Sequence, residues 1–364
     1  MMTRVPPTRV IQVANGVRTR LQSLVQRMVP PEIGLLELTS GFMATQAIYA
    51  AARLRIADVL AGGPRSATDI AAEVGSDPDA TYRLLRACAT YGVFVEDSEG
   101  RFGLTLLASA LRSGVSNSML PVVLMLGDPR YQGPWGRLAD TVETGTPGAE
   151  LLFGKPLWEY LDDDPEFAAS FNNAMTRLSA LDWPTVQAAY DFTGFSTIVD
   201  IGGGHGELLA LILDAAPAAK GVLFELPGMV DQAEEHLRQA GVGERCRVEG
   251  GSFFEAVPSD GDLYVMRRVI HDFDDEQAVA ILSNLCRQLS NDQTLLLLES
   301  VISPGNAPHF AKLLDLDMMV FVGGRERTAR QFDALLDRAG FRLTRIIPTI
   351  STISLIEAVP GRQP

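Results

Sequence analysis

A glycine-rich loop, residues 202–206, follows a short apolar segment and precedes a segment with helical periodicity. Its sequence, Gly-Gly-Gly-His-Gly, lets the backbone turn sharply and approach a ligand closely. A dinucleotide site with the pattern G-x-G-x-x-G would need its third glycine where this chain has Glu207. An acid there would face a pyrophosphate at a helix N-terminus, which is unfavourable. The loop therefore favours a ligand with a cationic centre and no phosphate, and S-adenosylmethionine is such a ligand.

An acidic residue, Glu225, lies about 20 residues beyond this loop, at the end of the next apolar segment. A carboxylate in that place can accept hydrogen bonds from both ribose hydroxyls of an adenosine. A solvated acid at a strand end is the alternative interpretation. The loop and the acid together favour an adenosine-containing ligand, and Asp200, two residues before the loop, is assigned to the same site.

The residue best placed to move a proton is His271. It follows a predicted strand at 262–266, so it should lie in a loop at the carboxyl edge of a sheet, where ligands bind in this architecture. An imidazole can take a proton from a hydroxyl near neutral pH. Considered alone, His271 could equally cap a helix or lie at the edge of a core.

Two acids are predicted at the same edge of the sheet as His271. Glu299 ends a predicted strand, and Glu326 precedes a predicted helix. Two carboxylates converging on a histidine would orient it and stabilise its protonated form. An ion pair of Glu326 with Arg325 or Arg327 is the alternative, but the joint placement of the three residues favours catalysis.

The elements that must position these residues alternate between strand and helix after residue 195, which predicts a Rossmann-like, doubly wound α/β sheet. Strands are predicted at 197–201, 221–226, 246–249, 262–266, 294–299, 343–348 and 352–358, and helices near 206–215, 229–240, 275–289 and 328–339. A short turn at 349–351 makes the last two strands an antiparallel hairpin at the edge.

The N-terminal part is predicted to be mostly helical. Ser66 can cap a first helix and Asp77 or Asp79 a second, and strand-forming residues flank the acidic turn at 96–100. Helix, turn, helix and hairpin together predict a winged helix. Acids at the start of its second helix and in its wing disfavour DNA reading.

Four regions are predicted along the chain: an N-terminal arm (1–35), a winged-helix domain (36–114), a helical linker or lid (115–190) and a sheet domain (191–364). An amphipathic helix at 9–28 is expected to pack on a partner subunit, with a membrane surface as the alternative. The apolar segment 37–60 is expected to form a buried helix or helix pair.

The composition excludes several classes of protein. The 364 residues carry a net charge of -14, which repels nucleic acid. No apolar run reaches the ~18–20 residues of a membrane helix. Three scattered cysteines suit a reducing cytoplasm rather than a disulfide framework, and the four histidines lack the spacing of a zinc site.

Four ordered motifs resemble the small-molecule O-methyltransferases, a family that includes plant caffeic-acid and flavonoid enzymes and bacterial enzymes that tailor polyketides and phenazines. They begin at Val199, Phe224, Ile270 and Gly324 and read VDIGGGHG, FELP, IHDFDDE and GRERT. The resemblance runs from about residue 36 to 358. It implies S-adenosylmethionine as cofactor, an aromatic hydroxyl substrate and a homodimer built by the winged-helix domain.

The resemblance also implies roles for residues at matching positions. His271 matches the catalytic base, and Glu299 and Glu326 match the acids beside it. The remaining matches lie in the cofactor site (Asp200, Gly202, Gly204, Gly206, Glu225, Ser252, Phe253 and Arg267) and in the substrate pocket (Phe171, Met175, Asp272 and Met318).

Two positions depart from the family pattern. Ser252 stands where an aspartate usually bonds the adenine amino group, and its uncharged hydroxyl is expected to bind more weakly. Phe273 replaces a tryptophan, which keeps the aromatic ring without the indole donor.

The predicted function is thus S-adenosylmethionine-dependent O-methylation, in which His271 removes the proton and the oxygen attacks the sulfonium methyl in line. No metal is required. The acids Asp272, Asp274 and Asp275 are expected to cap the next helix rather than bind magnesium. Methyl transfer to nitrogen or carbon, a relative without activity, and a ligand-binding transcriptional regulator are the alternatives.

Overall fold

The computed structural model describes residues 28–306 and 308–361. Contacts divide the chain into two compact units. Within the described residues, the winged-helix unit comprises 28–133 and 161–178, and the sheet unit comprises 134–160 and 179–361 without residue 307. Most of the predicted helix at 9–28 lies outside the described residues.

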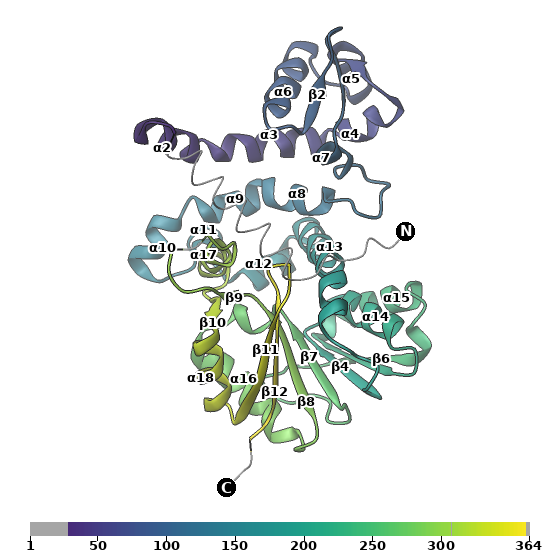
Figure 1. Cartoon of the computed structure of the whole chain (residues 1–364), viewed down its shortest axis with the longest axis vertical. Helices are drawn as coiled ribbons and strands as arrows, with labels where there is room; N and C mark the ends of the chain where they lie inside the picture. Colours follow the sequence, from purple (N-terminus) through teal and green to yellow (C-terminus); the bar gives the residue numbers. More distant parts are fainter. Residues whose placement is uncertain (1–27, 307, 362–364) are drawn as a thin grey trace. The chain divides into compact units, whose positions relative to one another are not determined.

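The winged-helix unit contains the predicted helix-turn-helix and hairpin (Figure 1). Its elements are α2 (Pro31–Thr39), α3 (Gly41–Arg53), α4 (Ile56–Val59), the short turn η1 (Leu60–Gly62), β1 (Arg65–Ser66), α5 (Ala67–Val74), α6 (Pro78–Thr90), β2 (Phe94–Glu96), β3 (Arg101–Leu104), α7 (Leu106–Ser109) and α8 (Leu120–Gly127). The three strands pair in the order β1-β3-β2. The winged helix is confirmed.

Local capping fixes the two central helices of this unit. The hydroxyl of Ser66 accepts a hydrogen bond from the amide of Asp69 at 3.1 Å and starts α5. Gly75 ends α5 with a positive φ of 72°. Asp77, not Asp79, caps α6, accepting from the amide of Ala80 at 2.8 Å. The carboxylate at the start of the second helix thus caps that helix.

The expectation of a buried helix or helix pair at 37–60 is wrong for its first part. Helix α2 has no buried residue among the described side chains, and α3 buries only Ala51 and Ala52. Leu36, Leu38 and Phe42 are 61%, 69% and 59% exposed. Large apolar side chains exposed so close together in the chain are typical of an interaction site, so the apolar composition of this segment does not reflect burial within one chain.

The stretch of chain at 115–190, which follows the winged helix in the sequence, is mostly helical, as predicted. Besides α8, its helices are α9 (Pro129–Trp135), α10 (Leu138–Thr144), α11 (Gly148–Phe153), α12 (Leu157–Asp163) and the 25-residue α13 (Pro165–Ala189). Helix α13 begins in the winged-helix unit and ends in the sheet unit. None of the helices at 28–306 and 308–361 is both long enough and apolar enough to cross a membrane.

The sheet unit is built on seven strands in the order β11-β12-β8-β7-β4-β5-β6 (Figure 1). Their bounds are β4 (Thr197–Ile201), β5 (Lys220–Glu225), β6 (Cys246–Gly250), β7 (Leu263–Arg267), β8 (Thr294–Glu299), β11 (Phe341–Pro348) and β12 (Ser354–Pro360). The strands β4 to β8 are parallel, and β12 is antiparallel to both β8 and β11. The predicted Rossmann-like sheet and its antiparallel last strand are confirmed.

Two apolar clusters cover the two faces of this sheet. Helices α16 (Asp275–Gln288) and α18 (Ala329–Arg338) pack on one face, with Val199 and Leu297. Helices α14 (Glu207–Ala215) and α15 (Val230–Gln239) pack on the other, with Ile198 and Leu298. Successive residues of a strand therefore point to the helices on opposite faces of the sheet, because side chains alternate between the two faces along a strand.

Three elements of the sheet unit were not predicted. Helix α17 (Ala311–Phe321) precedes the Glu326 loop, and the two-residue strands β9 (Val301–Ile302) and β10 (Arg327–Thr328) form a separate parallel pair. The chain runs from β4 outward to β6 and then returns to β7 on the other side of β4. The carboxyl ends of β4 and β7 thus form the switch point where ligands bind in such sheets.

Candidate active site

The glycine-rich loop leaves β4 in a conformation that only glycine adopts readily. Gly202, Gly204 and Gly206 have φ values of 68°, 59° and 82°. A Cβ at Gly203 would lie 2.4 Å from Oδ2 of Asp200 and 2.5 Å from Leu223 Cδ1. Each glycine is therefore required by backbone conformation or by close packing, and the loop presents bare backbone at the switch point.

The two acids assigned to the cofactor lie on the neighbouring strands β4 and β5. Glu225 accepts hydrogen bonds from the amide of Gly204 at 3.0 Å and of Leu226 at 2.6 Å. Asp200 is fully buried, and neither of its carboxylate oxygens has a hydrogen-bond partner among the described residues. Burial, assisted by the charge of Glu225, raises the pKa of Asp200 to about 7. Unpaired buried oxygens beside a glycine cradle suit a ligand that is cationic and donates hydrogen bonds, so these residues fit S-adenosylmethionine.

The acid at the third-glycine position, Glu207, turns away from the loop. Its Oε2 lies 2.7 Å from Nε2 of His236 on α15. This pairing ties the first turn of α14 to α15. It explains why an acid is tolerated beside the glycines.

The other predicted cofactor residues make contacts within the protein. Arg267, at the end of β7, forms an ion pair with Asp182 of α13 at 2.8 Å. The hydroxyl of Ser252 accepts from the amide of Phe254 at 3.3 Å, and the ring of Phe253 lies edge-on to Phe273. Asp182 was not singled out in the sequence, where an isolated acid in a helix gives no functional signal.

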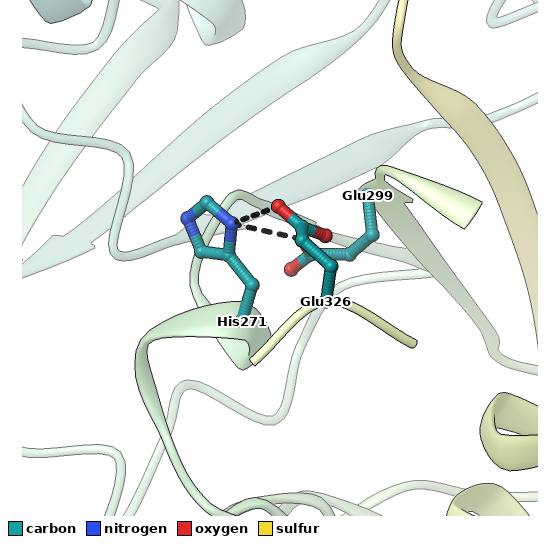
Figure 2. A group of neighbouring side chains, drawn as sticks. All are labelled: His271, Glu299 and Glu326. Carbon is teal, nitrogen blue, oxygen red and sulfur yellow. Dashed lines mark hydrogen bonds and ion pairs between the residues drawn. The ribbon is translucent and has the colours of Figure 1, made fainter. Parts of the chain in front are cut away.

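His271, Glu299 and Glu326 come together at one point, as predicted (Figure 2). His271 lies in the short turn η4 (Ile270–Asp272) after β7, Glu299 ends β8, and Glu326 directly precedes β10. Glu326 approaches because Gly324 lies against the backbone of His271, where a Cβ would come within 2.0 Å of the histidine carbonyl oxygen. The amide of Arg325 donates to that same carbonyl at 2.8 Å.

The distances define unequal roles for the two acids. Nδ1 of His271 lies 2.8 Å from Oε1 of Glu326 and 3.9 Å from Oε2 of Glu299 (Figure 2). Glu299 uses its other oxygen to accept from the amides of Val269 and Ile270, at 3.1 and 2.9 Å. Glu326 thus holds the imidazole ring directly, whereas Glu299 holds the backbone that carries it.

Burial governs the electrostatics of this cluster. His271 is 5% exposed, Glu299 0% and Glu326 3%. Burial raises the pKa of Glu326 to about 8 and also raises the pKa of Glu299. Asp272, whose Oδ1 lies 3.4 Å from Nε2 of His271, has its pKa raised by burial to about 7. Burial therefore brings the pKa values of Glu326 and Asp272 close to neutral pH, a kind of shift that is common in active sites.

The ligand atoms of His271, Glu299 and Glu326 lie within 4.8 Å of one another, a spacing that could hold a metal ion. The 2.8 Å contact between Nδ1 and Glu326 is that of a shared proton, however. Two ligands of a tetrahedral zinc would lie ~3.3 Å apart, given its bond lengths of about 2.0–2.1 Å. The geometry of this contact is therefore that of a hydrogen bond and not that of two ligands to one zinc ion.

The neighbouring aspartates have separate partners. Asp274 caps α16 by accepting from the amide of Gln277 at 2.8 Å, as predicted. The expectation that Asp272 and Asp275 cap this helix as well is wrong, because Asp274 alone is its N-cap and Asp272 lies 3.4 Å from His271. Asp275 pairs with Arg325 and Arg327. The alternative ion pair of Glu326 with these arginines is thus wrong, because both reach Asp275 instead. Arg327 is fully buried, which the sequence did not indicate.

The predicted substrate-pocket residues occupy helices in both units. Phe171 and Met175 lie on the part of α13 that belongs to the winged-helix unit, and Met318 is a buried residue of α17 in the sheet unit. Their part in a pocket stays a prediction.

Comparison with known proteins agrees with this geometry. The family model of the O-methyltransferase domain matches residues 135–342 of this chain. The family model of the O-methyltransferase dimerisation domain matches residues 36–114. The phenazine O-methyltransferase PhzM of Lysobacter antibioticus is 41% identical over 332 residues, which cover 91% of this chain and 97% of the relative.

Two further relatives differ in the chemistry that their names state. The 8-amino-8-demethylriboflavin N,N-dimethyltransferase of Streptomyces davaonensis is 37% identical over 314 residues, covering 85% of this chain and 90% of the relative. The crystal structure of NcsB1, an O-methyltransferase from neocarzinostatin biosynthesis in complex with S-adenosylmethionine and 2-hydroxy-5-methyl naphthoic acid, has a TM-score of 0.75 at 32% identity and covers 87% of this chain and 95% of its own. Given both domain matches and the glycine cradle, the chain belongs to the O-methyltransferase family and is an S-adenosylmethionine-dependent methyltransferase of small molecules.

Proposed function

We propose that this enzyme methylates a hydroxyl of an aromatic or polyketide-like small molecule, with His271 as the general base. The observation that carries the proposal is the buried hydrogen bond between Nδ1 of His271 and Glu326. A histidine held at one nitrogen by a carboxylate offers its other nitrogen as a base of fixed orientation. The substrates named for the relatives, a phenazine and a naphthoic acid, support an aromatic acceptor.

The protonation state of the pair decides which nitrogen is basic. When Glu326 is ionised, Nδ1–H donates to it, and Nε2, which lies 3.4 Å from Oδ1 of Asp272, carries the lone pair that takes a proton. When Glu326 is protonated, its hydroxyl can donate to Nδ1, and the imidazole proton then resides on Nε2. Because the pKa of Glu326 is about 8, the competent form increases as the pH rises through that value.

S-adenosylmethionine supplies, when bound, an electrophilic sulfonium methyl group that the deprotonated acceptor oxygen takes. Asp200, Glu225 and the backbone of residues 202–206 would hold it. After proton removal, the imidazolium of His271 is stabilised by Glu326 at 2.8 Å and by Glu299 at 3.9 Å. Much of the rate enhancement then comes from holding two reactants in the correct orientation.

Transfer to nitrogen is the second candidate, because a relative that is 37% identical is named as an N,N-dimethyltransferase. The buried pair favours oxygen. A neutral amine has a lone pair and can attack before it loses a proton, whereas a weakly acidic hydroxyl needs a base. The homodimer is likewise proposed, on the match to the dimerisation domain, and a cytoplasmic location stays a prediction.

A paired panel of acceptors tests the proposal. The enzyme is incubated with methyl-labelled S-adenosylmethionine and with phenols and anilines that share the same ring systems, and the products are analysed by mass spectrometry. We expect the label on phenol oxygen. Labelling of the anilines alone would contradict the proposal and leave the family assignment intact.

A further inference from the structure

Arg327 is the largest fully buried side chain of the described residues, and it lies against the segment that carries His271. Its Nη1 donates to the carbonyl oxygen of Ile270 at 3.0 Å, and its Nη2 donates to that of Phe273 at 2.9 Å. Its Nε donates to Oδ1 of Asp275, also at 2.9 Å. The two carbonyls flank the dipeptide His271-Asp272, so one guanidinium spans the turn that presents the imidazole.

Two buried side chains, Glu299 and Arg327, hold the backbone of this turn through its amides and its carbonyls respectively. Glu299 accepts hydrogen bonds from the amides of Val269 and Ile270, before the histidine. Arg327 donates to carbonyls before and after it. A turn of three residues in 3₁₀ geometry has few hydrogen bonds of its own, so these side chains must hold its backbone.

Arg327 is also adjacent in sequence to Glu326, which bonds the imidazole directly. The carboxylate of Glu326, directly before β10, therefore contacts the His271 ring, and the guanidinium of Arg327, the first residue of β10, contacts the backbone that carries His271. Glu326 thus constrains the ring of the histidine, and Arg327 constrains its attachment to the backbone. A lysine could not replace this contact, because a single ammonium cannot span two carbonyls in a planar fork.

We infer that Arg327 is a positioning residue of the methyl transfer, which sets the orientation of His271 for proton removal. This inference rests on the proposed role of His271 as base. Burial of a guanidinium is costly unless its donors are satisfied, and here Asp275 supplies the balancing charge. The hydrogen bonds of Arg327 to Ile270 and Phe273 therefore hold the turn that carries His271.

The test compares Arg327→Gln and Arg327→Lys with the parent enzyme, using one weakly acidic and one strongly acidic phenol. Arg338→Gln is the matched control, because Arg338 forms an exposed ion pair with Glu276 in the same unit. S-adenosylhomocysteine binding, measured by calorimetry, reports whether each variant is folded. Asp275→Asn is a milder second variant, since it removes the negative charge that balances Arg327 and leaves the guanidinium in place.

For Arg327→Gln we expect kcat with the weakly acidic phenol to fall roughly 10²-fold, the cost of a misplacement of about 1 Å. The strongly acidic phenol, already ionised, should lose much less, while KM and S-adenosylhomocysteine binding stay near the parent values. Arg327→Lys should restore little. Asp275→Asn should show a smaller loss with the same preference for the acidic phenol, and it decides the matter if Arg327→Gln does not fold.

An equal loss with both phenols in a variant that binds S-adenosylhomocysteine would overturn the inference, because a merely structural role acts on every acceptor alike. A parent-like rate in Arg327→Gln would overturn it too. Failure of the parent enzyme to methylate any phenol would instead contradict the proposed function. The two failures are therefore distinguishable.

Discussion

Glu326 lies 2.8 Å from His271, although 55 residues separate the two in the chain. The contact forms between the turn after β7 and the loop before β10, where Gly324 permits the two backbones to touch. A carboxylate with a pKa of about 8 beside the histidine makes the pair sensitive to pH in the range where the enzyme would work. The His271–Glu326 pair therefore combines orientation of the base with control of its protonation.

The first prediction concerns pH. In the parent, the rate should fall as the pH drops through about 8, because protonation of Glu326 moves the imidazole proton to Nε2. Glu326→Gln cannot ionise, so its rate should change less between about pH 7 and pH 9, at a lower maximum. The ratio of variant to parent rates, measured with one phenol, cancels the ionisation of the acceptor. A ratio that does not vary with pH would show that Glu326 does not titrate in this range.

The second prediction concerns the cofactor site. S-adenosylhomocysteine should bind and raise the melting temperature by mass action on the native state. Glu225→Ala should weaken this binding by roughly 1–3 kcal/mol, the usual cost of losing a charged hydrogen-bond partner. Titration calorimetry measures the affinity of the parent and of Glu225→Ala, and Glu234→Ala on α15 is the control at an exposed acid. Equal affinity in parent and Glu225→Ala would remove Glu225 from the cofactor site.

The third prediction concerns assembly. The exposed apolar surface of α2 and α3 should be buried in a homodimer whose interface exceeds the roughly 2,000 Å² at which obligate dimers begin. The double variant Leu38→Glu with Phe42→Glu should dissociate it, whereas Val142→Glu, at a side chain that is 68% exposed on α10, should not. Light scattering at about micromolar concentration reports the mass. A monomeric parent would contradict the prediction.

The fold could be predicted well from the sequence because its signals are local. Apolar runs of strand length gave β4 to β8 to within a residue or two, and Ser66 and Asp77 cap α5 and α6 as their chemistry requires. Helix α17 was not predicted, although Met318 on it was assigned to the pocket. Its segment is apolar on several sides, so no clear helical periodicity distinguishes it.

The residues of the site could be predicted from the sequence, but the different contacts that its two acids make could not. The resemblance placed both acids beside His271, yet only coordinates show that Glu326 bonds the ring and Glu299 the backbone. The sequence also suggested an ion pair for Glu326 with its neighbours in the chain. Asp275 pairs with both arginines instead, although Arg325 and Arg327 lie 50 and 52 residues away in the chain, and such a long-range pairing has no local signature.

The central claim is that His271 removes the proton, and its replacement tests this most directly. His271→Ala should bind S-adenosylhomocysteine nearly as well as the parent, because Asp200, Glu225 and the glycine loop are intact. Glu299→Gln and Glu326→Gln should each lose less activity, and combined changes should be non-additive since the three residues act as a unit.

The decisive measurement is the rate of labelled methyl transfer by His271→Ala across phenols of decreasing acidity. Turnover of a weakly acidic phenol should fall by roughly 10²–10⁴, the usual contribution of a general base. The loss should shrink as the acceptor becomes acidic enough to ionise by itself. If the variant methylates every acceptor as fast as the parent does, His271 is a structural residue and the proposed mechanism is wrong.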